Sequence, residues 1–210
     1  MRSMRSMRSM DGRSWRRGGY AGDAGYTMTE LVITLTLIGI VAGFAAPRID
    51  YQRYRADAGA RVVRGVLQQA QRLAVLRQYD VIVSFDVAND RVRVIEDANN
   101  NRSQDGAERG SWKPLAEGAR FARPAAAGIG GTMVDAEVTG ADVRQVGGYS
   151  SITFHRDGAA STDLEVYITA GSSVESNLRG IAVTQSTGRA DAYRYNPTNP
   201  AGSKWLGSVL

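Results

Sequence analysis

The most apolar stretch of the chain lies near its N-terminus. From Leu31 to Ala46, sixteen consecutive residues carry no charge. Including residues 26–28 brings the segment to about 20 residues, close to the length that crosses a bilayer. Pro47 ends the run, and one carboxylate, Glu30, stands at its start, where a charge is costly unless it is paired. The pattern therefore predicts an apolar helix with a special glutamate in its first turn.

Past Pro47 the apolar positions recur every three or four residues, which is the period of a helix with one buried face. These positions are Tyr54, Ala58, Val62, Val66, Ala70 and Leu73, flanked by Val63, Leu67 and Ala74. We expect one long helix from about Thr27 to Gln78, gently kinked near Pro47. Its first half is apolar all round and its second half is one-sided.

The apolar period then changes to two, which is typical of strands. Residues 81–87 and 91–95 predict a β-hairpin. Further strands are expected at 119–122, 151–155, 163–169, 178–185 and 189–195. Residues 124–150 are rich in Gly and Ala, and we expect a long loop with short strand pieces there. In the tail, we expect Trp205 and Leu206 to dock on the domain.

The positive charge of the chain is concentrated before the apolar run. Residues 1–25 hold six arginines and two aspartates, a net charge of +4, so the rest of the chain lies near +1. A basic segment beside an apolar run marks the side kept in the cytoplasm. The charge therefore does not indicate a general nucleic-acid-binding surface. The leader begins with a tripeptide repeat and leaves four possible starts, Met1, Met4, Met7 and Met10.

The composition excludes several classes of active site. Cysteine is absent, so there is no disulfide framework, cysteine zinc site or thiol nucleophile. A metal site built from histidines needs more than the single histidine of this chain, His155. We expect His155 at the surface, at the end of a strand. No Ser/His/Asp arrangement, phosphate-binding loop or dinucleotide fingerprint is present. We therefore expect no enzyme activity, no catalytic or metal-binding residues and no cofactor.

Two ordinary explanations of the apolar run are less satisfactory. A secretory signal peptide cut after Ala45 or Ala46 would have an unusually long apolar region, compared with about 7–15 residues, and would place Pro47 beside the cut. A plain membrane anchor would leave Glu30 unexplained.

The residues around this run resemble the N-terminus of type IV pilins. In the family pattern, a glycine precedes the cleavage site. Phenylalanine or another residue, a threonine, two variable positions, a glutamate and about 20 apolar residues follow it. Here the matching residues are Gly25, Tyr26, Thr27, Glu30 and the apolar run to Pro47. Tyr26 stands where phenylalanine is usual. Downstream segments, QQAQRLAVLRQ, DVIVSFDV, DANNN…DGAE, SITFHRDG and GIAVTQSTGRA, resemble the GspH/FimT branch of minor pseudopilins and minor pilins. The resemblance covers residues 25 to about 195.

The resemblance implies an α+β, pilin-like fold, with a long N-terminal helix packed on antiparallel β-sheets. It divides the chain into a leader (1–25), a transmembrane and filament-core half-helix (26–47), an amphipathic half-helix (48–79) and a β-rich domain (80–210).

It also implies a processing and assembly route. Prepilin peptidase would cut between Gly25 and Tyr26 and methylate the new amine of Tyr26. Glu30 would pair with the N-terminal amine of a neighbouring pilin or pseudopilin in the filament. The protein would cross the bacterial inner membrane once, with its C-terminal domain in the periplasm or outside. The sequence does not distinguish a subunit of a type II secretion system from a subunit of a type IV pilus.

Two further signals give alternative functions. In the loop from Asp97 to Glu108, oxygen-bearing side chains fall at the positions of an EF-hand calcium loop, although Arg102 stands where such loops need glycine. This indicates either a calcium-binding, membrane-anchored β-domain or a solvated loop.

The late basic residues Arg179, Arg189, Arg194 and Lys204, with Gly188 before Arg189, are similar to the basic end of DNA-uptake pilins. This indicates either a DNA-binding minor pilin or solvated strand edges.

Overall fold

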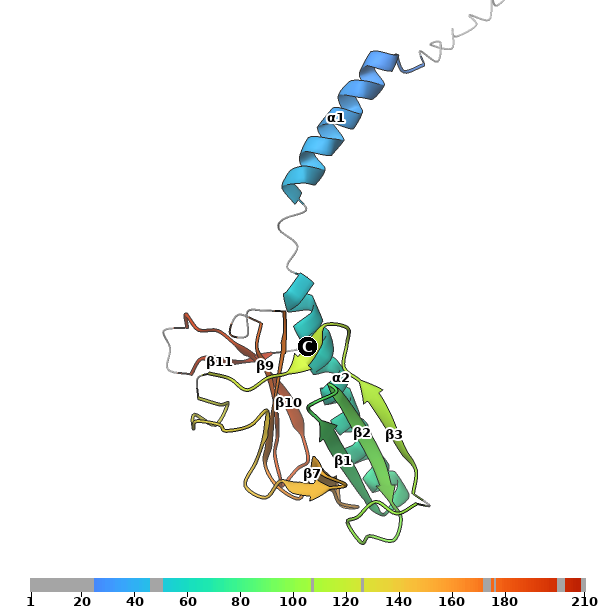
Figure 1. The fold of residues 1–210 in the computed structure, drawn as a ribbon, viewed down its shortest axis with the longest axis vertical. Coiled ribbons are helices and arrows are strands. Elements are labelled where there is room, and N and C mark those ends of the chain that lie inside the picture. The colour runs from blue at the N-terminus through green and yellow to red at the C-terminus, as the bar shows by residue number, and fades with distance from the viewer. Residues whose placement is uncertain are drawn as a thin grey trace, which may run out of the picture. The chain divides into compact units, whose positions relative to one another are not determined.

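The computed structural model describes residues 25–45, 51–106, 108–125, 127–171, 175, 177–199 and 203–208. The chain divides into two compact units, Met1–Ile49 and Asp50–Leu210 (Figure 1). The first unit contains one described helix, α1 (Met28–Ala45). The second begins with α2 (Tyr51–Arg77). Pro47 and the residues beside it lie outside the described ranges, so the single kinked helix and the boundaries at 25/26 and 47/48 stay predictions.

One face of α2 is buried, as its periodicity predicts. The buried residues are Ala56, Gly59, Ala60, Val63, Val66, Leu67, Ala70 and Ala74. The expectation for Tyr54 is wrong, because its side chain is 68% exposed. Small residues set the buried face in this half of the helix: a Cβ added at Gly59 would lie 2.6 Å from the Cβ of Ala119. The strands thus approach α2 beside Gly59 and leave Tyr54 outside.

The first sheet has the strand order β3-β2-β1-β7-β6, and all its pairs are antiparallel. The strands are β1 (Asp80–Asp86), β2 (Arg91–Asp97), β3 (Gly110–Pro114), β6 (Arg144–Val146) and β7 (Tyr149–Phe154). The predicted hairpin is confirmed as β1 and β2. β3 was not expected, because its short sequence has no alternation.

The second sheet has the order β11-β10-β9-β8-β4, with β5 paired to β8. The strands are β4 (Ala119–Phe121), β5 (Val138–Thr139), β8 (Leu164–Ala170), β9 (Arg179–Val183), β10 (Ala190–Tyr195) and β11 (Trp205–Ser208). The tail docks as β11. Trp205 is 7% exposed, and its ring packs against Tyr167 and Tyr195 at centroid distances of 5.4 and 5.2 Å. Leu206 lies in the same strand, where it pairs with Arg194 of β10, and its side chain stays 42% exposed.

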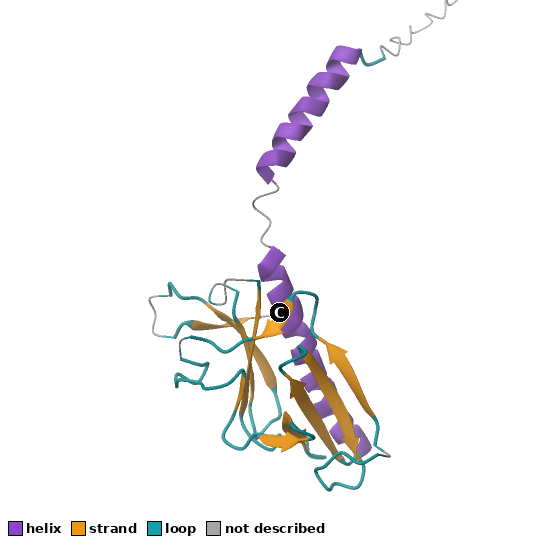
Figure 2. Cartoon of the chain, in the orientation of Figure 1, coloured by secondary structure: helices purple, strands orange, loops and turns teal. Residues whose placement is uncertain are grey.

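One cluster of buried side chains joins α2 to both sheets. It includes Val63 and Leu67 of α2, Phe85 of the first sheet and Ile168 of the second. Figure 2 shows α2 lying along the strands of the first sheet. The expected fold class, α+β with a helix packed on antiparallel sheets, is confirmed.

Candidate functional site

The first turn of α1 is closed by reciprocal hydrogen bonds between Thr27 and Glu30. The backbone N–H of Glu30 donates to Thr27 Oγ1 at 3.2 Å, and the backbone N–H of Thr27 donates to Glu30 Oε2 at 2.9 Å. The Thr27 hydroxyl also donates to Oε2, at 3.0 Å. This is a capping box, which satisfies N–H groups that a first helical turn leaves without partners. Among the described residues, none donates to the second carboxylate oxygen, Oε1.

Sequence reasoning identified Glu30 but missed the role of Thr27. The spacing Thr-x-x-Glu before an apolar run is the sequence signature of a capping box and was sufficient to predict this contact. The structure therefore gives Glu30 a function within its own helix, besides any function between subunits.

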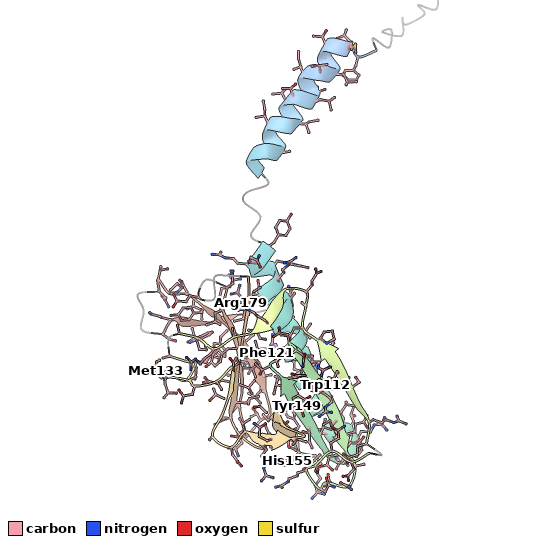
Figure 3. All side chains as sticks on the ribbon, viewed as in Figure 1. Trp112, Phe121, Met133, Tyr149, His155 and Arg179 are labelled. Atoms are coloured by element: carbon pink, nitrogen blue, oxygen red, sulfur yellow. The ribbon has the colours of Figure 1, made fainter. Side chains whose placement is uncertain are left out.

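The surface of α1 is apolar and uncovered. Every described side chain from residue 26 to residue 43 is exposed. The large aliphatic side chains are between 52% and 66% exposed: Leu31, Val32, Ile33, Leu35, Leu37, Ile38, Ile40 and Val41. Figure 3 shows these side chains projecting around the helix. A contiguous apolar surface of this kind on a soluble protein marks a site of contact with protein or membrane.

The hydroxyl groups of α1 are satisfied inside the helix. Thr34 Oγ1 donates to the carbonyl oxygen of Leu31 at 2.9 Å, and Thr36 Oγ1 donates to that of Val32 at 2.7 Å. Such back-bonding removes the need for water at the two hydroxyls. Glu30 is then the one charged side chain of α1, and it lies at the end of an apolar surface.

The predicted processing residues lie directly before this helix. Gly25 and Tyr26 are both exposed, and Tyr26 is 85% exposed. No heavy atom lies within 4 Å of the position that a Cβ would take at Gly25. The peptide bond between them is thus accessible, and the leader before Gly25 lies outside the described residues. In the described part of the chain, no helix has both the length and the apolarity needed to cross a membrane.

The loop from Asp97 to Glu108, for which calcium binding is one of two interpretations, is held by its own hydrogen bonds. The carboxylate of Asp97 accepts the backbone N–H groups of Asn101 at 3.0 Å and Arg102 at 2.7 Å. Asp105 Oδ2 accepts the side-chain amide of Asn101 at 2.8 Å, and the backbone N–H of Asp105 donates to Glu108 at 3.0 Å. No group of three or more histidine or acidic residues that could hold a metal occurs among the residues described. These hydrogen bonds hold the loop in shape without requiring a metal ion.

The late basic residues do not form one surface. Arg179 is buried with its side chain 0% exposed, so the expectation of a solvated strand edge is wrong for it. Arg179 and Arg194 both contact the carboxylate of Asp57, at 2.5 and 3.4 Å. Arg189 is 73% exposed and pairs with Asp191 at 2.9 Å. Because these carboxylates offset much of the charge, the arrangement gives no support to the DNA-binding alternative.

His155 lies just after β7, as expected, but it is half-buried and paired. Its Nδ1 lies 3.1 Å from Asp80 Oδ2. The backbone N–H of Asp80 in turn donates to Asn100 Oδ1 at 2.7 Å. These contacts tie the end of β7 to the loop that follows β2, so His155 has a structural function.

Aromatic and arginine side chains form a stack on the first sheet. The sequence analysis did not predict this stack, because its members come from three strands that are separate in the sequence. The rings of Trp112 and Tyr149 contact each other edge to face, with their centroids 5.0 Å apart (Figure 3). The Arg93 guanidinium lies 4.5 and 5.6 Å from these two centroids. Arg91 lies 4.4 Å from the Trp112 centroid. Burial lowers the pKa of Arg93, and its Nε and NH2 atoms have no hydrogen-bond partner. The stack thus connects β2, β3 and β7 through their side chains.

Comparison with known proteins gives structural neighbours only. No protein-family model and no curated protein sequence matches the chain. A crystal structure of the minor pseudopilin EpsH from the type II secretion system of Vibrio cholerae is 15% identical, covers 70% of this chain and 99% of that chain, and has a TM-score of 0.45. A second EpsH structure is 12% identical, covers 62% and 90%, and has a TM-score of 0.40.

The type IV minor pilin FimU of Pseudomonas aeruginosa is 15% identical, with coverage of 66% of this chain and 87% of that chain and a TM-score of 0.40. At these identities and scores the similarities assign no function.

Proposed function

We propose that this chain is a minor pilin or pseudopilin, a filament subunit of a type II secretion or type IV pilus system. The observation that carries the proposal is the uncovered apolar helix α1, with its single carboxylate in the first turn and the sequence Gly25-Tyr26 directly before it. A helix that is apolar all round needs an apolar environment on every side. A membrane followed by the centre of a helical filament would supply such an environment at each stage.

The proposed route begins with the leader on the cytoplasmic side and residues 26–47 in the inner membrane. Prepilin peptidase cuts the accessible bond after Gly25 and methylates the new amine of Tyr26. Removing the basic leader takes away the charge that holds the segment on the cytoplasmic side. The β-rich domain then lies in the periplasm or outside, and the chain has a structural function without enzyme activity.

Glu30 would link one subunit to the next. Within its own helix the carboxylate uses Oε2 for the capping box. Among the described residues, no group donates a hydrogen bond to Oε1, so this oxygen can accept one from a neighbouring subunit. The amine of a neighbouring Tyr26 would supply both that donor and a positive charge. Pairing of this kind is how a carboxylate is tolerated among apolar side chains.

The test is the N-terminus of the mature protein. The full-length chain is expressed in a host that contains prepilin peptidase, purified from membranes and analysed by intact mass and N-terminal sequencing. We expect a chain that begins at methylated Tyr26 and has lost residues 1–25. The matched control is Gly25→Val, which should leave the leader attached because the narrow peptidase site accepts glycine. A mature chain that begins near Ala46 or Pro47 would refute the proposal and identify a secreted domain.

A further inference from the structure

Two tyrosines at the start of α2 are exposed. Tyr51 is 63% exposed and Tyr54 is 68% exposed. Figure 2 shows the first turn of α2 extending beyond the strands of both sheets, so these rings lie outside the packed core. Tyrosine suits a boundary between apolar and aqueous surroundings, because its ring is apolar and its hydroxyl is polar.

Arginines lie beside these rings on the same side of the helix. At about 100° per residue, four side chains fall within about 120° of the helix circumference: Tyr51, Tyr54, Arg55 and Arg61. The Arg61 guanidinium lies 5.7 Å from the ring centroid of Tyr54. Two side-chain atoms of Arg55 lie 3.0 Å from the position that a Cβ would take at Gly118, the residue directly before β4. The start of β4 therefore continues this side of the helix.

Hydrogen bonds hold two arginines of this region without neutralising them. Nε of Arg61 donates to the carbonyl oxygen of Asp57 at 3.3 Å. NH2 of Arg120, an exposed residue of β4, donates to the carbonyl oxygen of Gly171 at 3.1 Å. A carbonyl oxygen satisfies an N–H group but carries no net charge. Among the described residues, no carboxylate forms an ion pair with Arg55, Arg61 or Arg120.

The acidic side chains nearby leave the net charge positive. The carboxylate of Asp57 already contacts Arg179 and Arg194. Glu117 is exposed and directly precedes Gly118 in the turn that leads into β4. One glutamate against the three arginines leaves a surplus of positive charge, which favours an anionic partner.

The sequence connects this region closely to the apolar segment. Tyr51 follows Ala45, the last residue of α1, by six residues, and six residues of extended chain span at most about 20 Å. The polar headgroup layer on each side of a bilayer is about 5–8 Å thick. With residues 26–47 in the membrane, the start of α2 is therefore within reach of the lipid headgroups.

We propose that five residues form a surface that binds the headgroups of anionic lipids: Tyr51, Tyr54, Arg55, Arg61 and Arg120. We call it the tyrosine–arginine surface, and it rests on the membrane placement in the proposed function. The arginines bind lipid phosphate groups, and each basic residue close to an anionic membrane strengthens binding about fivefold. The tyrosine rings lie at the depth of the headgroups, where tyrosine is enriched in membrane proteins. The surface holds the β-rich unit against the membrane before the subunit enters a filament.

Hydrogen–deuterium exchange of the full-length chain in lipid nanodiscs tests this contact. Discs of phosphatidylcholine are compared with discs of phosphatidylcholine and phosphatidylglycerol at the same ionic strength. The first N–H groups of a helix have no acceptor within it, so their exchange responds to contact with lipid. We expect peptides that cover residues 51–61 to exchange about fivefold more slowly, or slower still, in the anionic discs. Exchange of β1 checks the fold and should be the same in both discs.

Two double variants and a matched control assign the effect, all compared in the anionic discs. Arg55→Gln combined with Arg61→Gln removes two positive charges, and Tyr51→Ser combined with Tyr54→Ser removes two rings. Each pair should return residues 51–61 to nearly the exchange rate seen in neutral discs. The matched control is Arg72→Gln, which changes an exposed arginine on the same side of α2, about 16 Å farther along the helix. It should exchange like the wild type.

The outcomes separate this inference from the proposed function. Equal exchange of the wild type in both kinds of disc would overturn the lipid contact and leave the membrane placement intact. Slow exchange that needs the arginines but is the same in neutral discs would also overturn it, in favour of a contact with protein. An effect of Arg72→Gln as large as that of the arginine pair would show general charge attraction in place of a defined surface. A chain that does not enter the discs would refute the membrane placement and this inference with it.

Discussion

The glutamate of α1 has two separable functions, and substitution can tell them apart. As part of the capping box, Glu30 accepts from the N–H of Thr27. As the proposed partner of a neighbouring amine, it supplies a negative charge. Glutamine serves in a capping box as well as glutamate does, but it carries no charge. Glu30→Gln should therefore keep the cap and lose the link between subunits.

The expected magnitudes differ enough to be measured. Thr27→Ala removes the hydroxyl that accepts from the N–H of Glu30, and loss of such a cap costs about 1 kcal/mol. Glu30→Gln leaves an amine without its counter-charge in an apolar environment, which costs about 3–5 kcal/mol. At 1.4 kcal/mol per factor of ten, the two losses correspond to roughly fivefold and at least about a hundredfold less incorporation.

The assay is quantitative mass spectrometry of membrane and sheared-filament fractions, with the filament signal divided by the processed protein in the membrane. Glu30→Ala should be processed normally and should assemble as poorly as Glu30→Gln. Normal incorporation of Glu30→Gln, together with poor incorporation of Thr27→Ala, would show that the carboxylate serves only to cap its own helix.

Three further predictions concern the β-rich unit and its helix. Gly65→Ala should raise the free energy of unfolding by about 1 kcal/mol, because no atom lies within 4 Å of the position that its Cβ would take. Gly59→Ala should lower the free energy of unfolding by about 1–3 kcal/mol, because its Cβ would lie 2.6 Å from that of Ala119. Thermal melts of the two variants would compare these effects. Burial opposes ionisation of Asp86, but its hydrogen bonds with Asn89 and Arg91 outweigh that effect and lower its pKa below the ordinary 3.8. Its contribution to stability is thus present above pH 3.8 and lost as the pH falls through the folded-state pKa, so Asp86→Asn should flatten the fall in melting temperature at acid pH. A calcium chelator should leave the melting temperature unchanged, because the hydrogen bonds of Asp97 hold the loop without a metal ion; a drop would support the calcium alternative.

Local signals in the sequence were sufficient for much of the fold. The β1–β2 hairpin follows from alternation around Asn89 and Asp90, and Asp90 has the positive φ of 49° that suits a tight turn. The buried face of α2 followed from its period, but the exact face depended on the close approach at Gly59, which no periodicity contains. Tyr54 was misplaced for that reason.

Contacts between distant residues could not be predicted from the sequence. Asp57 lies 122 positions from Arg179, and neither residue is marked by its neighbours as half of a buried ion pair. The sequence therefore groups Arg179 with the late basic residues of solvated strand edges, whereas its side chain is 0% exposed. The motif at the N-terminus could be recognised from the sequence, because its residues lie within six positions of one another: Gly25, Tyr26, Thr27 and Glu30.

The dependence of α2 on distant strands has a consequence for synthesis. Arg64 Nε donates to the carbonyl oxygen of Ala190 at 3.2 Å, and the side-chain amide of Gln71 donates to that of Thr187 at 2.6 Å. Translation proceeds at about 5–20 residues per second, so strand β10 follows the end of α2 by roughly 6–24 s. During that interval the β1–β2 hairpin can already cover part of the apolar face of α2, but the second sheet is still incomplete. The part of α2 that packs on the second sheet therefore gains its final contacts, including those of Arg64 and Gln71, only when the last third of the chain has been made.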